Sequence, residues 1–470
     1  MVSHRGTRQF HYDDPTIQML DSIDFSGKVK LQSDGCENSA EDHIQKALSA
    51  SLQKKSKKID AFLQANGNNL RKHLHQLYGF ATSHDGLMKD EYREKIWPIL
   101  AEYIPFAPKL NRDNNSRKKA NSRATSDNEA SCSEDQDDSD FESALSSFDE
   151  SDERNTSDND LDNENTLEPS IEELRKHREW NQVELDVNRT LARFPPNISD
   201  DEREHLQHDL TPLIVRLLWE NPGFSYYQGF HDICLTLILV MGGRQALKAA
   251  RILTRRASFY NYLTYTLEET ALAELQNVYV LLYLYDPDVE QHMRNAELGT
   301  LFGLSWLLTW FSHDLQHYEQ IVILFDLFLS SHHMMPVYVG AALIYERRDE
   351  VLSTEQEMPI LHQLLNTVPS NVNVNKIIDT ARTLFERFPP PLVQGGFRKA
   401  YEEMCIRQQD RKQKVAKLQQ MIPRQQAVKP LPRHNLFQWV MTHPLEAAGA
   451  VAGTAILAYL TKNLSTQFSP

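Results

Sequence analysis

Residues 177–232 read HREWNQVELDVNRTLARFPPNISDDEREHLQHDLTPLIVRLLWENPGFSYYQGFHD. Apolar residues recur at helical spacing through 205–220, and Pro212 predicts that this helix is broken or restarts there. Apolar periodicity does not account for two polar residues, Arg189 and Gln228, each of which lies inside a short patterned sequence. These two residues are therefore the first candidates for function.

The two patterned sequences are suited to presenting polar side chains. In VELDVNR, Asp186 and Arg189 are three residues apart, so on a helix their side chains are neighbours on one face. In YYQG, Gly229 permits a close approach of the backbone and Gln228 is displayed beside it. We therefore expect a helix that carries the arginine and a turn that carries the glutamine.

An arginine and a glutamine presented together indicate phosphoryl-transfer chemistry. An arginine supplied by a partner stabilises the charge that develops on the γ-phosphate of a nucleotide, typically for a gain of about 10³ to 10⁵ in rate. A glutamine amide can hold the attacking water. The alternative is that Asp186 and Arg189 form an ordinary solvated ion pair, which contributes little.

A third sequence, REKIWPIL, comes earlier in the chain and carries Arg93 and Trp97. The three sequences in this order resemble the RxxxWxxL, IxxDxxR and YxQG motifs of the TBC-domain Rab GTPase-activating proteins. The resemblance covers about residues 70–400 and is closest to a branch anchored in the endoplasmic reticulum. Val183 stands where the family has isoleucine, and Phe325 stands where many members have tryptophan.

The resemblance implies a role for each motif residue. Arg189 is expected to be the arginine finger and Gln228 the glutamine finger, with Asp186 holding Arg189 and with Tyr226 and Gly229 shaping the loop. Of the first motif, Trp97 is expected to anchor the core and Arg93 to brace the domain.

The resemblance also implies the partner. This is a Rab small GTPase in its GTP form, of the Rab-one type that serves transport from endoplasmic reticulum to Golgi. GTP and magnesium belong to that partner, and we expect no cofactor of the chain's own. Two alternatives are a Rab-binding scaffold without catalytic effect and a helical membrane adaptor without a nucleotide partner.

The fold class is predicted to be all-α, a stack of about twelve to sixteen helices. Helical spacing extends through 59–78, 89–100, 233–241, 245–284, 289–311, 318–329 and 336–345, and no stretch alternates as a strand does. The expected organisation is a weakly ordered region over 1–58, the first helices of the domain over 59–110, an insertion over 111–166, the remainder of the domain over 167–400, a basic helical tether over 401–435, a hydrophobic anchor over 436–462 and a tail over 463–470.

The net charge of −15 comes from one segment. Residues 127–168 hold seventeen acidic residues and one basic residue, Arg154, so the rest of the chain is nearly neutral. A segment this polar cannot form a core, and we expect the insertion over 111–166 to be disordered. Its serines followed by acids suit an acid-directed kinase. After it, Ser170 and Glu173 predict a capped helix start.

The C-terminal part predicts a membrane anchor. The apolar run over 445–460 would extend about 24 Å as a helix, whereas a bilayer core needs about 30 Å. Extension back to Phe437 supplies the missing length, and the basic residues before it suit the cytosolic side. We expect a tail anchor that leaves the chain facing the cytosol; the alternative is a helix lying on the membrane surface.

Other classes of protein are disfavoured. The four cysteines lie far apart with no CxxC pair, which argues against a zinc site or a disulfide framework. His332 and His333 lie without acids or cysteines at ligand spacing, so they predict no metal site. The lysine run over 54–58 is not interleaved with aromatic residues, so no nucleic-acid partner is expected.

Overall fold

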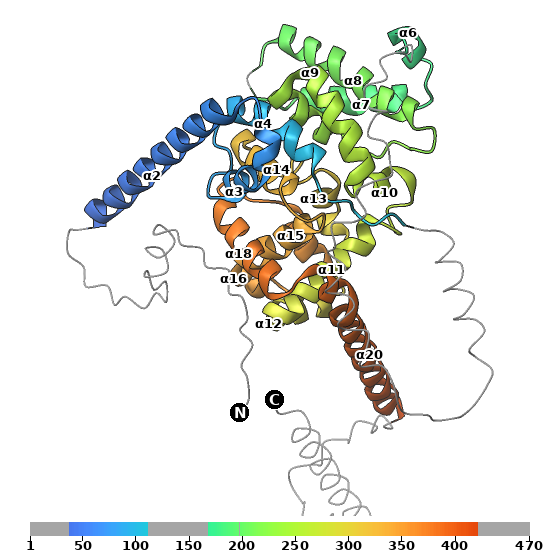
Figure 1. The fold of residues 1–470 in the computed structure, drawn as a ribbon. Coiled ribbons are helices and arrows are strands. Elements are labelled where there is room, and N and C mark those ends of the chain that lie inside the picture. Colours follow the sequence, from blue (N-terminus) through green and yellow to red (C-terminus); the bar gives the residue numbers. More distant parts are fainter. Residues whose placement is uncertain (1–36, 111–167, 197, 422–470) are drawn as a thin grey trace, which may run out of the picture. The chain divides into compact units, whose positions relative to one another are not determined.

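The computed structural model describes residues 37–110, 168–196 and 198–421 (Figure 1). The chain divides into two compact units after Val393. Within these residues there are helices and no strand, which confirms the all-α prediction. The expected disordered insertion and hydrophobic anchor lie outside the described residues.

The first unit contains most of the helices. Those before the insertion are α2 (Glu37–Asn66), the 3₁₀ helix η1 (Leu70–His73), α3 (Leu74–Thr82) and α4 (Asp90–Glu102). After it come α6 (Ile171–Leu174), α7 (Trp180–Leu191), α8 (Asp200–Glu220), α9 (Phe230–Arg256), α10 (Phe259–Thr264), α11 (Ala271–Tyr285) and α12 (Pro287–Asn295). The unit continues with η3 (Leu301–Gly303), α13 (Leu304–Leu308), α14 (Tyr318–Leu329), α15 (Met335–Glu346), α16 (Arg348–Ser353), α17 (Met358–Asn366), α18 (Val374–Arg387) and α19 (Pro390–Leu392).

The helices of the first unit gather in groups (Figure 1). Helices α7, α8 and α9 lie at one end and pack against one another, and α4 packs against both α9 and α14. At the other end α11, α12, α15 and α18 form a second packed group. The arginine and glutamine motifs both belong to the first group, in α7 and in the loop between α8 and α9.

Helix α9 is the core helix of the first group. Among the described residues it alone is long and apolar enough to cross a membrane, but 61% of its most apolar window is buried inside the protein. The helix bends at Gly242, whose φ of 70° and ψ of 162° are not helical. Burial of apolar area on this scale stabilises the fold at about 25 cal/mol per Å², so α9 is best explained as packing within the domain.

Several helix boundaries differ from those expected. The expected helix over 59–78 is interrupted after Asn66 and resumes as η1 and α3. The expected helix over 289–311 divides into α12, η3 and α13, and ends where Trp310 and Phe311 adopt φ of 49° and 65°. The ring of Phe311 stacks on Trp306 at 5.7 Å between centroids. Tertiary packing thus holds a turn that sequence periodicity does not reveal.

The predicted break at Pro212 is wrong. Helix α8 runs from Asp200 to Glu220 with Pro212 inside it. Proline removes one backbone hydrogen bond and crowds the preceding turn, at a cost of about 3 kcal/mol. The buried apolar residues on both sides of Pro212 offset that cost: Leu210, Leu213, Ile214, Val215, Leu217 and Leu218. The predicted helix start at Ser170 is confirmed, with Glu173 completing a capping box.

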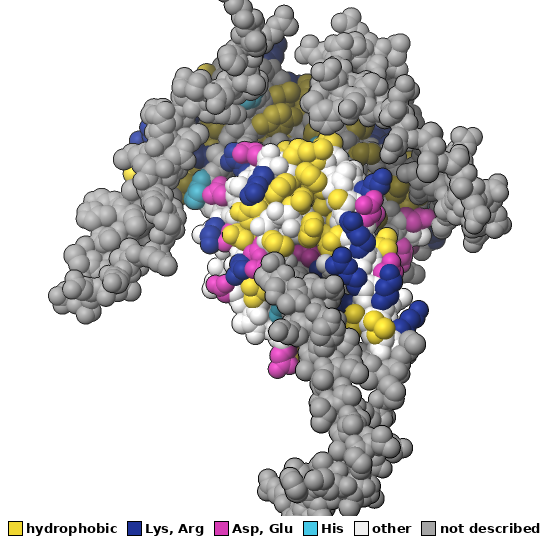
Figure 2. Space-filling view, turned by 90° about the horizontal axis from the view of Figure 1, so that it is seen from below, with side chains coloured by type: hydrophobic (Ala, Val, Ile, Leu, Met, Phe, Trp, Pro, Cys, Tyr) yellow, Lys and Arg dark blue, Asp and Glu magenta, His cyan; other side chains and the backbone are white. Residues whose placement is uncertain are grey.

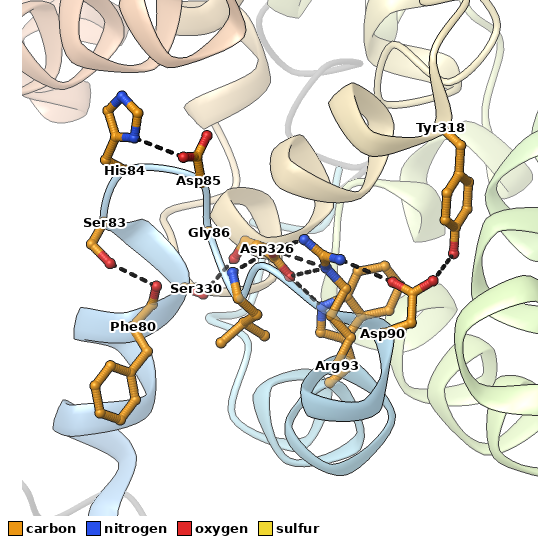
Figure 3. Close-up of polar contacts among 12 residues, drawn as sticks. Phe80, Ser83, His84, Asp85, Gly86, Asp90, Arg93, Tyr318, Asp326 and Ser330 are labelled. Carbon is orange, nitrogen blue, oxygen red and sulfur yellow. Dashed lines mark hydrogen bonds and ion pairs between the residues drawn. The ribbon is translucent and has the colours of Figure 1, made fainter. Parts of the chain in front are cut away.

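A buried ion pair joins α4 to α14 (Figure 3). Arg93 Nη2 donates to Asp326 Oδ2 at 3.0 Å, and the two side chains are 4% and 0% exposed. Trp97 Nε1 donates to Asp326 Oδ1 at 2.7 Å, and the backbone N–H of Leu87 donates to Oδ2 at 2.8 Å. Arg93 Nη1 also donates to Asp90 at 2.9 Å. Arg93 therefore links α4 to α14 inside the domain.

Exposed apolar side chains occur in several places, and Figure 2 shows a face on which hydrophobic side chains gather among charged ones. Exposed apolar atoms are ordinary on folded proteins, so apolar exposure alone does not mark a site. One case differs because of its neighbour. Leu185 is 52% exposed and lies one turn before Arg189 on α7.

The second unit contains the helix α20 (Arg398–Met421). Its sequence carries the basic residues Arg407, Arg411, Lys412, Lys414 and Lys417. These residues belong to the segment 401–435 that was expected to form a basic helical tether. Helix α20 thus extends over the first part of that segment.

Candidate functional site

Arg189 lies in the last turn of α7. Its side chain is 68% exposed, whereas the Asp186 side chain beside it is 1% exposed. Arg189 Nη1 donates to Asp186 Oδ1 at 3.2 Å, so the expected pair is present. A guanidinium has five N–H donors. Most of them are therefore available to an external anion while the buried carboxylate fixes the side chain.

The YYQG sequence forms the end of the loop between α8 and α9. Tyr227 is buried and its hydroxyl donates to the carbonyl of Leu308 at 3.0 Å, which fixes the loop to the core. Gln228 is exposed, and its side chain makes no hydrogen bond with the described residues. Gly229 follows with a φ of 111° and begins α9. The glutamine amide is thus displayed on a firmly held loop.

One buried carboxylate connects the arginine to the glutamine loop. Asp186 Oδ1 accepts from Arg189, and its Oδ2 accepts from the hydroxyl of Tyr226 at 3.1 Å. Gln182, one turn earlier on α7, also donates to Oδ2 at 3.1 Å. Tyr226 precedes Gln228 by two residues. The structure therefore brings Asp186, Arg189 and the loop of Gln228 together.

A second layer of polar residues lies behind this carboxylate. His231 Nδ1 is 2.7 Å from the Tyr226 hydroxyl, and His231 Nε2 is 2.9 Å from the Thr190 hydroxyl. Thr190 also lies 3.3 Å from Asp232, whose other oxygen is 3.3 Å from His313 Nδ1. His231, Thr190 and His313 were not predicted from the sequence. The available signal was the polar pair His231-Asp232 at the start of an otherwise apolar run.

Asp232 follows Gln228 by four residues, but it neither makes a hydrogen bond with Gln228 nor occupies the N-cap position of α9. In the structure its carboxylate contacts Thr190 and His313 instead, and Gly229 occupies the N-cap position of α9. Asp232 belongs to the second polar layer, because the first turn of α9 points it toward α7.

Burial sets the protonation of the inner residues. Burial, followed by the neighbouring Asp186 charge, raises the pKa of Tyr226 far above its ordinary value, so this hydroxyl is protonated. Burial lowers the pKa of His231, with Asp232 and Asp186 opposing that effect. The hydrogen bond that His313 donates to Asp232 raises the pKa of His313. Tyr226 therefore always has a proton to donate to Asp186.

The remaining motif residues lie outside this cluster. Arg93 and Trp97 contact Asp326 between α4 and α14, where they hold helices together. Among the described residues no group of three or more His, Cys, Asp or Glu side chains is arranged to hold a metal ion. His332 and His333 lie with ring centroids 4.2 Å apart, and burial lowers the pKa of both. The candidate site is therefore the surface formed by α7 and the YYQG loop.

Gly229→Ala is predicted to destabilise the protein. A Cβ at this position would lie 2.8 Å from Thr309 Cγ2, and the φ of 111° is one that side-chain-bearing residues rarely adopt. Such strain costs about 1–3 kcal/mol. The measurement is the free energy of unfolding in urea. Gly223→Ala is the matched control, because it lies in the same loop and its Cβ would meet nothing within 4 Å. Equal stability of the two variants would contradict the prediction.

The chain matches known proteins over this region. The Rab-GTPase-TBC domain matches residues 90–352. TBC1 domain family member 20 of Mus musculus is 38% identical over 232 residues, which are 48% of this chain and 57% of that protein. GTPase-activating protein gyp10 of Schizosaccharomyces pombe is 31% identical over 208 residues, which are 43% of this chain and 54% of that protein. The Ypt/Rab-GAP domain of Gyp1p aligns with a TM-score of 0.46 at 15% identity, over 70% of this chain and 97% of that domain.

The described residues form an all-helical domain with an exposed arginine, Arg189, and an exposed glutamine, Gln228. The arginine and the loop of the glutamine both bond to the buried carboxylate of Asp186. The matched region covers more than half of the chain and includes Arg93, Arg189 and Gln228. The chain belongs to the Rab-GTPase-TBC domain family, which confirms the resemblance seen in the sequence. It spans 57% of the length of the mouse relative.

Proposed function

We propose that this chain accelerates GTP hydrolysis by a Rab-type GTPase, supplying Arg189 and Gln228 to the partner's nucleotide. One observation carries the proposal. Arg189 is 68% exposed and Gln228 is exposed, yet the arginine and the loop of the glutamine are tied to the same 1%-exposed carboxylate. A side chain that only solubilises a surface has no need of a buried anchor. A side chain that must enter a partner's site benefits from one.

The chemistry assigns a different task to each residue. In the partner's site GTP and Mg²⁺ are already bound, and the γ-phosphoryl group carries negative charge on its oxygens in the transition state. Arg189 neutralises this charge with the N–H groups that Asp186 leaves unused. Gln228 accepts from and donates to the attacking water, which it holds in line. Preorganised donors of this kind act strongly because they need no rearrangement during the reaction.

The face of α7 also offers a docking contact. Leu185 is 52% exposed one turn before Arg189, so an apolar side chain and the guanidinium lie on the same face. An apolar contact beside the arginine would bury Leu185 when the GTPase docks. Such a contact contributes about 1.5–3 kcal/mol for full burial of a leucine side chain.

The place of action is proposed from the sequence. Residues 436–462 are the proposed membrane anchor and residues 401–435 the basic tether, with α20 forming part of it. The resemblance of the chain favours the cytosolic face of the endoplasmic reticulum and a Rab of the Rab-one type. In that arrangement the chain would act on vesicle transport between endoplasmic reticulum and Golgi.

The test is GTP hydrolysis by a panel of purified Rab proteins with the full chain in detergent. We expect acceleration of at least one Rab, with the Rab-one type among those that respond. GTP-dependent binding without acceleration of any Rab would favour a scaffold. Absence of any GTP-dependent binding would favour an adaptor with no nucleotide partner.

A further inference from the structure

We propose that His231 is a positioning residue that locks the glutamine loop to the arginine helix through a directed chain of hydrogen bonds. The chain runs from Thr190 through His231 and Tyr226 to Asp186. This inference rests on the proposed function of Arg189 and Gln228. His231 touches neither of them and acts through the residues that hold them.

The geometry places His231 between two segments. Its side chain is 5% exposed in the first turn of α9, each ring nitrogen has one hydroxyl partner, and Nε2 also lies 3.4 Å from Asp232 Oδ1. Nδ1 lies 2.7 Å from the hydroxyl of Tyr226 in the loop, and Nε2 lies 2.9 Å from the hydroxyl of Thr190 on α7. Both distances are those of good hydrogen bonds. One ring therefore joins helix α7 to the loop that carries Gln228.

The direction of each hydrogen bond follows from the number of protons. Tyr226 has one proton and its hydroxyl donates that proton to Asp186 Oδ2, since a carboxylate can only accept. The 2.7 Å contact with His231 then requires Nδ1–H to donate to the Tyr226 oxygen. Burial favours a neutral ring, which has a single N–H, so Nε2 accepts from Thr190. The hydrogen bonds therefore all point the same way: Thr190 donates to His231, His231 donates to Tyr226, and Tyr226 donates to Asp186.

The distances agree with this direction. The Thr190 hydroxyl lies 2.9 Å from His231 Nε2 but 3.3 Å from Asp232 Oδ1, so it donates its hydrogen bond to His231. The chain of bonds begins at Thr190, the residue after Arg189, and ends at Asp186, three residues before Arg189. It crosses the loop at Tyr226 on the way. Displacement of His231 would therefore leave Tyr226 held by Asp186 alone, so the spacing between Arg189 and Gln228 would be fixed less firmly.

A buried histidine with satisfied nitrogens also occurs in structural roles, so the test must separate positioning from folding. The side-chain amide of asparagine occupies the place of Nδ1, and that of glutamine the place of Nε2. His231→Asn therefore keeps a donor for Tyr226, whereas His231→Gln keeps only the contact with Thr190. His231→Leu keeps neither.

The experiment measures kcat and KM for GTP hydrolysis by the responsive Rab with each full-chain variant. We expect His231→Gln and His231→Leu to lower kcat by about 10²-fold, the loss that a displacement of about 1 Å produces, with KM unchanged. His231→Asn should retain most of the rate. His292→Gln is the control for loss of a buried histidine, because His292 is 8% exposed in α12 and bonded to Gln356.

A second arm combines His231→Gln with Arg189→Ala and Gln228→Ala. If His231 acts only by placing the two fingers, His231→Gln has no further effect in that background. Equal losses for His231→Asn and His231→Gln, or a full additional loss in the double-finger background, would overturn the inference. If Arg189→Ala and Gln228→Ala leave the rate unchanged, the proposed function itself fails, which is a distinct outcome.

Discussion

Arg189→Ala is expected to lower the acceleration of GTP hydrolysis by about 10³-fold or more, the usual contribution of an arginine finger. This corresponds to at least about 4 kcal/mol of lost transition-state stabilisation. Binding of the GTP-loaded partner should change little, since the guanidinium acts on charge that appears only in the transition state. Gln228→Ala should lower the rate by about 10² or more for the related reason that the water is no longer held.

The measurement is single-turnover GTP hydrolysis with saturating full-length variant. Arg71→Ala is the matched control for Arg189→Ala, because Arg71 is 64% exposed and also forms an ion pair with a carboxylate, that of Glu102. Removing Arg71 deletes the same charge and the same kind of bond without touching α7. If both variants keep the wild-type rate, Arg189 has no catalytic role and the scaffold alternative gains.

Arg189→Lys separates charge from shape. Lysine keeps the positive charge but lacks the planar fork of donors that fits phosphate oxygens. It also cannot donate to Asp186 and to a phosphate in the same fixed geometry. We expect Arg189→Lys to recover only a small part of the rate lost in Arg189→Ala. Full recovery would mean that the residue acts as a distant charge and not as an inserted finger.

The proposed finger residues Arg189 and Gln228 were predictable from the sequence, and so was Asp186 beside Arg189, but the polar residues behind them were not. Arg189 and Gln228 each stand inside a short patterned sequence at a position that apolar periodicity does not explain, so local pattern reveals them. The pairing of Arg189 with Asp186 is also local, at three residues. The contact of Thr190 with His231 spans 41 residues. A single sequence contains no information on such a pair until the helices are placed.

The all-α fold class was also predictable from the sequence, whereas the positions of the helix ends were not. Apolar spacing gives the buried face of α8, but Pro212 remains inside that helix because its neighbours are buried on both sides. Trp310 and Phe311 adopt left-handed backbone angles because aromatic packing around Trp306 and Phe328 fixes their side chains. Propensity is a weak prior that tertiary packing overrides.

Asp326→Leu is expected to destabilise the domain by about 3–5 kcal/mol, a large part of a usual stability of about 5–15 kcal/mol. The change leaves the 4%-exposed Arg93 without its main acceptor and the N–H groups of Trp97 and Leu87 without any. Asp90 still accepts from Arg93, which limits the loss. The measurement is the free energy of unfolding of the full chain in urea.

Arg93→Met should cost less than Asp326→Leu, and its cost should depend on pH. Burial pushes the pKa of Asp326 upward, while Arg93 and the N–H donors oppose that shift. Without Arg93 the carboxyl can take a proton and still accept from Trp97. A group whose folded pKa is raised loses stabilisation as pH rises, so the gap to wild type should widen above about pH 4. Arg71→Met, at an exposed pair, should cost less than about 1 kcal/mol at any pH. The prediction would be contradicted if Arg93→Met lost as much stability as Asp326→Leu at every pH. That result would show that the Asp326 carboxyl stays ionised when Arg93 is absent.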